Sequence, residues 1–240
     1  MSGNRPDVPI AAILVAAGIA VGGYFVSHTL LNAKTGINTA EVKGLAERRV
    51  EADRANWKIR YTVTGSGTTE VSKLYERSDA DQARVIALLL ESGLDKSEIT
   101  PGVIDYQKQE FRDEHQKLVE EKQVLVGSID VETAKVRLVS EVRAKLNKLI
   151  AQGLDLQNLE PRYYFTKLND IKPAMVKEAT TNARVAANEF ASDAGVKVGG
   201  IREATQGGFL IQDVGEEFGD TKSIQKDVRL VTTITFYLTD

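Results

Sequence analysis

The chain has 240 residues, no cysteine, two histidines and a formal net charge of −3 at pH 7. The missing thiols exclude disulfides, thiol catalysis and cysteine-zinc sites. The slightly negative charge, with both signs interspersed, argues against a basic surface for nucleic acid. The length suits one sizeable domain or two small ones behind a short N-terminal segment.

An uncharged run from Val8 to Leu31 opens the chain. As a helix it would measure about 36 Å, and a bilayer core of ~30 Å requires roughly 20 apolar residues. A buried core helix is one alternative, but the run is long for one and lies at the terminus. A cleaved signal is another, but its apolar part would be shorter, and Ala33 with Leu31 two positions before it makes a poor cleavage site. The run therefore predicts a retained membrane anchor.

The flanking cations do not decide the orientation of this anchor, because Arg5 precedes the run while Lys34 and Lys43 follow it. A cytoplasmic N-terminus with an exported domain is the working hypothesis. It divides the chain into four expected segments: a cytoplasmic tail (1–7), a transmembrane anchor (8–31), a linker (32–39) and a periplasmic domain (40–240).

Gly18 and Gly22 form a small-xxx-small pair within the run. This spacing lets two helix backbones approach closely in a membrane. Glycine is also common in membrane helices without such a role. The pair is the one candidate site in the chain, as a helix-packing contact.

Strict alternation predicts strands in the exported part. From Asn56 to Gly65 the large apolar side chains fall on one face, and residues 41–53 are the expected partner strand, with a turn near Asp53–Arg54. Further strands are expected over residues 99–111, 116–131, 163–168, 196–205 and 226–238, with a long acidic loop over 207–221.

Helical spacing of apolar residues predicts helices over residues 69–91, 133–152 and 172–194. Gly93 and Gly153 are the expected stops of the first two, and Pro173 suits the first turn of the third. The order β-β-α-β-β-α-β-α-β-β is dominated by hairpins. It predicts an α+β fold, a mostly antiparallel sheet with helices packed on one side, preceded by one N-terminal transmembrane helix.

Three stretches of sequence resemble the SIMPL-domain family. Val42-Lys43-Gly44-Leu45-Ala46, followed by Ala52-Asp53-Arg54-Ala55, resembles the family's opening motif. The Ala-rich helix around residues 183–195 and the closing strand 228–238 resemble its third helix and terminal strand. Trp57 departs from the pattern, because a smaller apolar residue is expected there.

The resemblance implies a bacterial envelope location, usually periplasmic, and a tendency to self-associate. Some members are loosely associated with stress responses. The family offers no established catalytic residues, so none is carried over to this chain. The retained anchor distinguishes this chain from members with a cleavable signal.

The residues themselves offer no catalytic constellation. His28 lies at the end of the uncharged run and His115 in a predicted charged turn, with no His-x-x-x-His pair and no Gly-x-Ser-x-Gly elbow. The segment Gly65–Glu70 lacks the third glycine of a dinucleotide fingerprint and predicts a turn. We therefore predict no enzyme activity, no cofactor and no metal. The acidic loop 207–221 is the best candidate for a partner or ion contact.

Two functions are consistent with these features. The first is a non-enzymatic structural or interaction protein, anchored by a single pass in the bacterial inner membrane, with its main domain in the periplasm, that assembles into a homo-oligomer linked to envelope or oxidative stress. The alternative is a periplasmic binding module for a small molecule or envelope component, with a pocket between sheet and helices.

Overall fold

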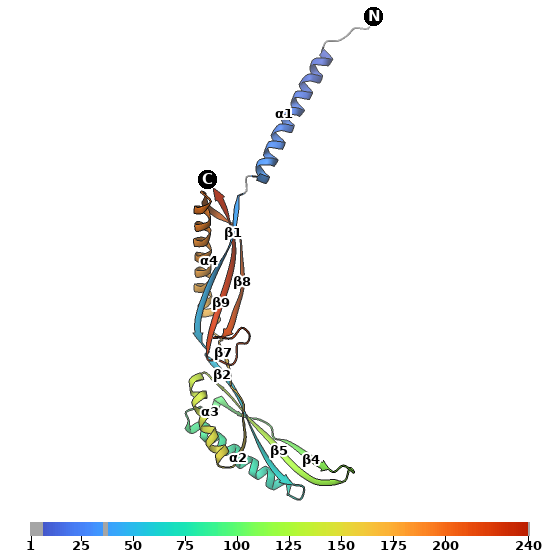
Figure 1. The fold of residues 1–240 in the computed structure, drawn as a ribbon, viewed down its shortest axis with the longest axis vertical. Helices are drawn as coiled ribbons and strands as arrows, with labels where there is room; N and C mark the ends of the chain where they lie inside the picture. The colour runs from blue at the N-terminus through green and yellow to red at the C-terminus, as the bar shows by residue number, and fades with distance from the viewer. Residues whose placement is uncertain (1–6, 36–37, 240) are drawn as a thin grey trace. The chain divides into compact units, whose positions relative to one another are not determined.

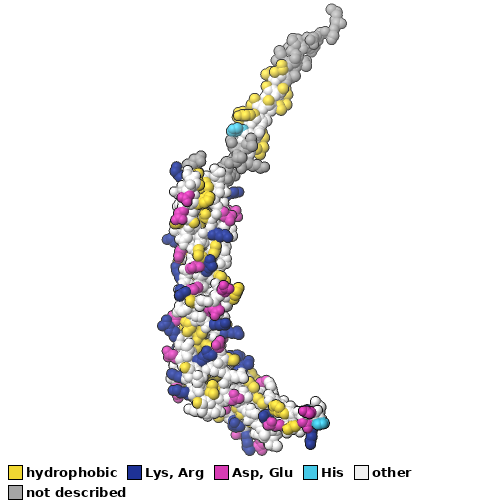
Figure 2. Space-filling view, viewed as in Figure 1, with side chains coloured by type: hydrophobic (Ala, Val, Ile, Leu, Met, Phe, Trp, Pro, Cys, Tyr) yellow, Lys and Arg dark blue, Asp and Glu magenta, His cyan; other side chains and the backbone are white. Residues whose placement is uncertain are grey.

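The computed structural model describes residues 7–35 and 38–239, with side chains described for residues 13–30 and 38–239. Residues 1–6 of the predicted tail and residues 36–37 of the predicted linker lie outside them. The helix α1 spans Asp7–Thr35. Its segment Ile13–Leu30 has a mean hydropathy of 1.7 and no buried residue. Figure 2 shows hydrophobic side chains along this helix, which has the length and composition either to cross a membrane or to act as a signal sequence.

Packing divides the chain into two units, which are described separately. The first comprises Met1–Ala46, Val176–Gly208 and Leu230–Asp240, and the second comprises Glu47–Met175 and Phe209–Arg229. Four elements contribute residues to both units. They are β1 (Thr39–Glu51), α4 (Leu168–Asp193), β8 (Lys197–Asp213) and β9 (Gln225–Thr239).

The strands β1, β9 and β8 form one sheet in that order. Strands β1 and β9 are antiparallel. The Leu238 N–H, near the end of β9, donates to the carbonyl of Asn38 just before β1, while Arg49 near the end of β1 pairs with Asp227 near the start of β9. In Figure 1, α4 lies along this sheet. In the first unit, Ala183 and Ala187 of α4 pack against Ile234 and Phe236 of β9.

An alanine at every fourth position lets α4 approach the sheet closely. Ala179, Ala183, Ala187 and Ala191 are all at most 1% exposed. A Cβ added at Gly44 would overlap the carbonyl oxygen of Ala179 and lie 2.8 Å from the Cβ of Ala183. The backbone of β1 therefore rests directly on the helix, which explains why glycine occupies position 44.

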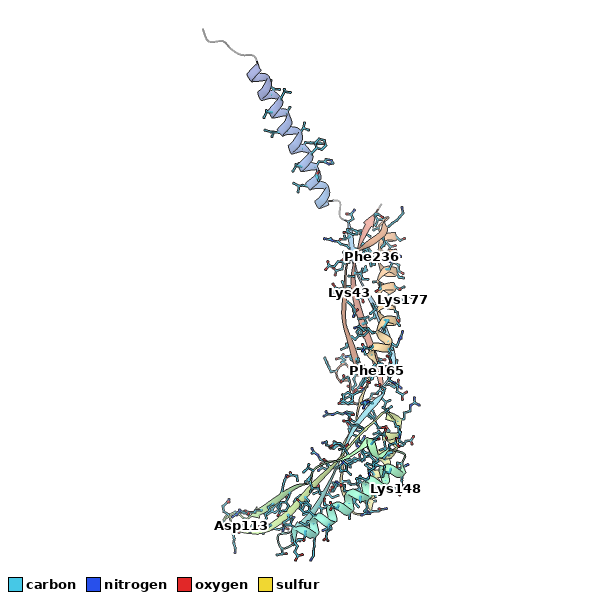
Figure 3. The ribbon with its side chains drawn as sticks, turned by 180° about the vertical axis from the view of Figure 1, so that it is seen from behind. Lys43, Asp113, Lys148, Phe165, Lys177 and Phe236 are labelled. Atoms are coloured by element: carbon cyan, nitrogen blue, oxygen red, sulfur yellow. The ribbon has the colours of Figure 1, made fainter. Side chains whose placement is uncertain are left out.

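A six-stranded antiparallel sheet forms the second unit. Its main path is β3 (Ile99–Pro101), β5 (Leu118–Thr133), β2 (Arg54–Ser66) and β6 (Asp155–Asn158), with β4 (Asp105–Arg112) paired to β5 and β7 (Arg162–Tyr164) paired to β2. The hairpin of β4 and β5 turns around Asp113, labelled in Figure 3, whose carboxylate accepts the N–H groups of His115 and Lys117.

Two helices, α2 (Val71–Glu91) and α3 (Val136–Ala151), cover one face of this sheet, and a 3₁₀ turn (Lys96–Glu98) precedes β3. The side chains of Trp57, Ile59 and Tyr61 from β2 point into the core that the helices complete. Tyr61 lies over Gly127 of β5, its cross-strand partner, where any Cβ would strike the phenol ring. Gly93 and Gly153 follow the helices with φ of 102° and 93°, as expected for helix stops.

The predicted α+β class, the antiparallel pairing and the helices on one face are confirmed. The expected pairing of residues 41–53 with the strand 56–65 is wrong, because β1 pairs with β9 and β2 pairs with β5. Strand β2 finds twelve registered partners in β5, from Ala55 opposite Thr133 to Ser66 opposite Lys122. The long register with β5 therefore outcompetes pairing with the neighbour in sequence, and two sheets replace the expected one.

Several boundaries also differ from the prediction. Residues 99–111 form two strands, β3 and β4; β6 was not expected; and β7 is shorter than 163–168. Helix α4 begins at Leu168, so Pro173 lies inside it and not in its first turn. Phe190 is 56% exposed, because the buried stripe of α4 follows a spacing of four residues through Ala187 and Ala191.

Gly44→Ala is expected to destabilise the chain by about 2–3 kcal/mol, since the added methyl group meets backbone atoms of α4 that cannot rotate away. Urea unfolding of the detergent-solubilised chain, followed by far-UV circular dichroism, measures the change. Gly200→Ala is the matched control, because a Cβ there has nothing within 4 Å. Equal unfolding midpoints for the two variants would refute the close approach of α4.

Candidate functional site

Core side chains fill the space between the sheet and the helices of the second unit. The binding-module alternative expects a pocket there. Ile59, Leu89 and Leu146 have no exposed surface there, and Tyr61 is 1% exposed. The Tyr61 hydroxyl also accepts a hydrogen bond from Gln82 Nε2 of α2, at 3.0 Å. The core therefore fills the region that the binding-module alternative required.

A groove of about 720 Å³ lies instead around the outward-facing residues of β2. Alternation on β2 directs Asn56, Lys58 and Arg60 to the face opposite the buried Trp57, Ile59 and Tyr61. Neighbouring strands and the loop after β8 complete the lining with these side chains: Asp130, Glu132, Leu159, Glu160, Pro161, Arg162, Tyr164 and Lys222. Its volume falls within the range of ~300–1,000 Å³ typical of small-molecule sites.

A two-residue connection, Ala52 and Asp53, joins β1 to β2 beside this region, where a hairpin turn was expected. The N–H groups of Ala52 and Asp53 donate to the carbonyls of Ile224 (2.8 Å) and Tyr164 (2.9 Å). The Asp53 carboxylate accepts the N–H of Thr166 at 2.6 Å and its hydroxyl at 2.8 Å. Desolvation raises the pKa of Asp53, but these two hydrogen bonds outweigh it and hold the pKa below its ordinary value.

The predicted acidic loop 207–221 is shorter than expected and is held by a buried ion pair. Strand β8 continues through Gly207 and Gly208 to Asp213. There the Asp213 carboxylate pairs with the Lys226 ammonium, and the two side chains are 1% and 0% exposed. The carboxylate also accepts the N–H groups of Lys222 (2.8 Å) and Ser223 (3.0 Å), and Lys226 donates to the carbonyl of Asp220.

These contacts hold the loop after β8 around the buried ammonium group of Lys226. Burial raises the pKa of Asp213, but Lys226 and the two N–H donors bring it below its ordinary value. The pattern of β9 indicates the buried position of Lys226. Lys226 opens a strand whose inward series continues with Val228 and Leu230, so period two places its side chain in the core.

The segment Gly65–Glu70 contains the predicted turn, at residues 67–69 directly after β2 ends at Ser66. The buried amide of Gln123 donates to the carbonyls of Ser66, Gly67 and Thr69 and closes it. His115 lies in the β4–β5 turn, while His28 lies on α1 beside Tyr24, with ring centroids 5.8 Å apart. Among the described residues, no three His, Asp or Glu side chains gather into a set suited to a metal ion.

Gly18 and Gly22 lie on α1, and a Cβ at either position would have nothing within 4 Å. Their surface is therefore open to a second helix. The packing contact expected from their spacing stays a prediction.

Asp53→Asn is expected to lose about 1–2 kcal/mol of stability at pH 7, because Thr166 loses a charged acceptor. A folded-state pKa below the ordinary value means that the carboxylate stabilises the fold above that ordinary value, and that this contribution is lost as pH falls through the folded-state pKa. The gap between the two proteins should therefore close on acidification. Urea unfolding at several pH values from 7 to 3 measures it.

A gap that stays constant down to pH 3 would contradict this role of Asp53. The matched control is Asp79→Asn, at an exposed position of α2, which is expected to change stability by less than about 0.5 kcal/mol.

Lys226→Met leaves the Asp213 carboxylate buried without its cation and should destabilise the chain by about 3–5 kcal/mol. Arg49→Gln breaks a pair of the same type at the surface, where Arg49 is 61% and Asp227 43% exposed, and should have little effect. Thermal unfolding of both variants compares them. Equal losses would show that Lys226 does not brace the loop.

The comparisons with known proteins agree with the sequence resemblance. A family model described as "SIMPL: Protein of unknown function (DUF541)" matches residues 40–227. No curated protein matches the chain significantly. The matched range contains Gly44, which α4 requires, and Asp53, whose carboxylate binds Thr166. The chain therefore belongs to the SIMPL (DUF541) family, whose function is unknown.

Proposed function

We propose that this chain is a non-enzymatic structural or interaction protein of the bacterial envelope. Helix α1 anchors it in the inner membrane by a single pass, with the N-terminus in the cytoplasm and residues 40–240 in the periplasm, and copies assemble into a homo-oligomer. The observation that carries the proposal is the exposed apolar surface of α1, on which Ile13, Leu14 and Ile19 are each more than 65% exposed.

Lipid is the natural solvent for such a helix. Apolar side chains cover it on all sides, and none of its span is buried in the chain. A helix that is hydrophobic all round requires a protein core or a bilayer around it. The length of the run favours retention over cleavage, because a signal has an apolar part of only ~7–15 residues.

Two surfaces support assembly. In the membrane, Gly18 and Gly22 offer a face with open space for a second α1. In the sheet of order β1-β9-β8, β8 is an outer strand of 17 residues, and its residues 200–206 are exposed. An outer strand offers unpaired backbone groups to another chain. Antiparallel pairing of two β8 strands can place Arg202 of one copy opposite Glu203 of the other.

A non-enzymatic role is supported by the partners of the groups whose pKa is shifted. Each of these charged groups is already engaged in a contact with another residue of the chain. The contacts are Arg49 with Asp227, Glu51 with Arg137, Asp53 with Thr166, Glu98 with Lys135, and Asp213 with Lys226. A link to envelope or oxidative stress rests on the family resemblance alone.

Two measurements on the full chain test the proposal. The chain should stay in the pellet after an alkaline carbonate wash of membranes, because α1 spans the bilayer. In a mild detergent, its native mass should be a fixed multiple of the 26.3 kDa of one chain. Release by carbonate would refute the anchor, and a monodisperse single chain would refute assembly.

The glycine pair has a matched control in the same helix. Gly22→Ile should reduce the mass of the particle, because the larger side chain separates the two helix backbones. Gly23→Ile adds the same bulk on a different face of α1 and should leave the mass unchanged. The opposite pattern would exclude the Gly18–Gly22 face from the contact.

A further inference from the structure

The outward-facing groove of the second unit combines cations without ion-pair partners and an acceptor without a donor. We propose that it binds an anionic, hydroxyl-rich small molecule, that is, a phosphorylated or carboxylated sugar. This binding site is independent of the anchor and of the assembly proposed above. It is built from three neighbouring strands and the loop that follows β8.

The cations carry the first part of the argument. Lys58 pairs with Asp130 at 3.0 Å, and Glu160 contacts Arg143 at 4.0 Å. In the described part of the chain, this leaves the side chains of Arg60, Arg162 and Lys222 in the groove without an ion pair, against Glu132 as the one unpaired acid. Three free cations against one free acid favour an anionic ligand. Two of them are arginines, whose planar fork matches phosphate and carboxylate.

The acceptors carry the second part. Asn56 and Glu132 are direct cross-strand partners on β2 and β5. The Oδ1 atom of Asn56 is buried and has no hydrogen-bond partner. A buried acceptor without a donor costs free energy that a bound donor restores. An adjacent amide oxygen and carboxylate are acceptors for sugar hydroxyl groups, and a simple inorganic anion would not satisfy them.

The register places the two groups of side chains along one face. Arg162 lies opposite Asn56 on the other side, so Glu132, Asn56 and Arg162 form one row across three strands. Arg60 follows two rows further along β2, about 14 Å away at ~3.4 Å per residue. A ligand that bridges these rows extends over more than one polar group. Tyr164, half-buried beside the row, offers an aromatic surface for a sugar ring.

Trp57 supplies a reporter, because it is the only tryptophan of the chain. It lines the groove, is 2% exposed, and its Nε1–H donates to the carbonyl of Leu159 at 2.9 Å. Leu159 lines the groove as well, so a ligand that displaces its loop changes the surroundings of the indole.

Isothermal titration calorimetry and Trp57 emission test the proposal on the full chain. A polyoxyethylene detergent is suitable, because its head group carries neither charge nor sugar. Glucose 6-phosphate and glucuronate distinguish a phosphorylated from a carboxylated ligand, with glucose and inorganic phosphate as the partial probes. We expect one of the two sugar acids to bind with a Kd below about 1 mM, and both partial probes to bind more weakly.

Arg60→Gln and Arg162→Gln should each weaken that binding roughly tenfold or more, because each removes a charged donor. Lys148→Gln makes a matched loss of one charge on α3, labelled in Figure 3, and should leave the affinity unchanged. Absence of both heat and emission change with the two sugar acids would overturn the proposal. Equal binding of glucose would overturn the role of the cations, and equal weakening by Lys148→Gln would show a non-specific charge effect.

Discussion

The connection at Ala52 and Asp53 is the constraint on which the second unit depends. It ends β1 and starts β2, the strand at the centre of the six-stranded sheet. Its two N–H groups are bound by the carbonyls of Ile224 and Tyr164, and its carboxylate holds Thr166, two residues before α4 begins. This short connection thus ties together segments that are far apart in sequence. Three of its four hydrogen bonds involve a backbone group, so they fix the path of the main chain directly.

The periodic parts of the fold were predictable from the sequence. Strand β2 and strand β9 alternate strictly, and α2 and α3 end at glycines with positive φ. These are local signals, which depend on side-chain spacing and backbone freedom. Pairing is not local, so the sequence favoured the neighbour β1 as the partner of β2, whereas β5 provides the longer register. The short strands β3, β6 and β7 carry too few residues to show a period.

The candidate site was the least predictable part. Arg60 and Arg162 are separated by about a hundred residues in the chain and line the same groove because β7 pairs with β2. Their residue types alone look like ordinary solvated strand positions. The buried position of Lys226 follows from the alternation of β9. Its partner Asp213 lies at the end of β8, a strand whose two glycine pairs resemble loop sequence. The family resemblance identified Gly44 and Asp53 without a reason for either, and the structure supplies both reasons.

The alanine stripe of α4 has a consequence for how the first unit tolerates change. A methyl group is the smallest side chain that an L-residue can present, so the contact of Ala179 and Ala183 with Gly44 contains almost no side-chain volume that a substitution could remove. Nearly every substitution there adds side-chain volume to a contact that is already close-packed. Sequence variation at these positions should accordingly be confined to serine, glycine and alanine, while the opposite face of the same helix, which bears the exposed Val185, is free to vary.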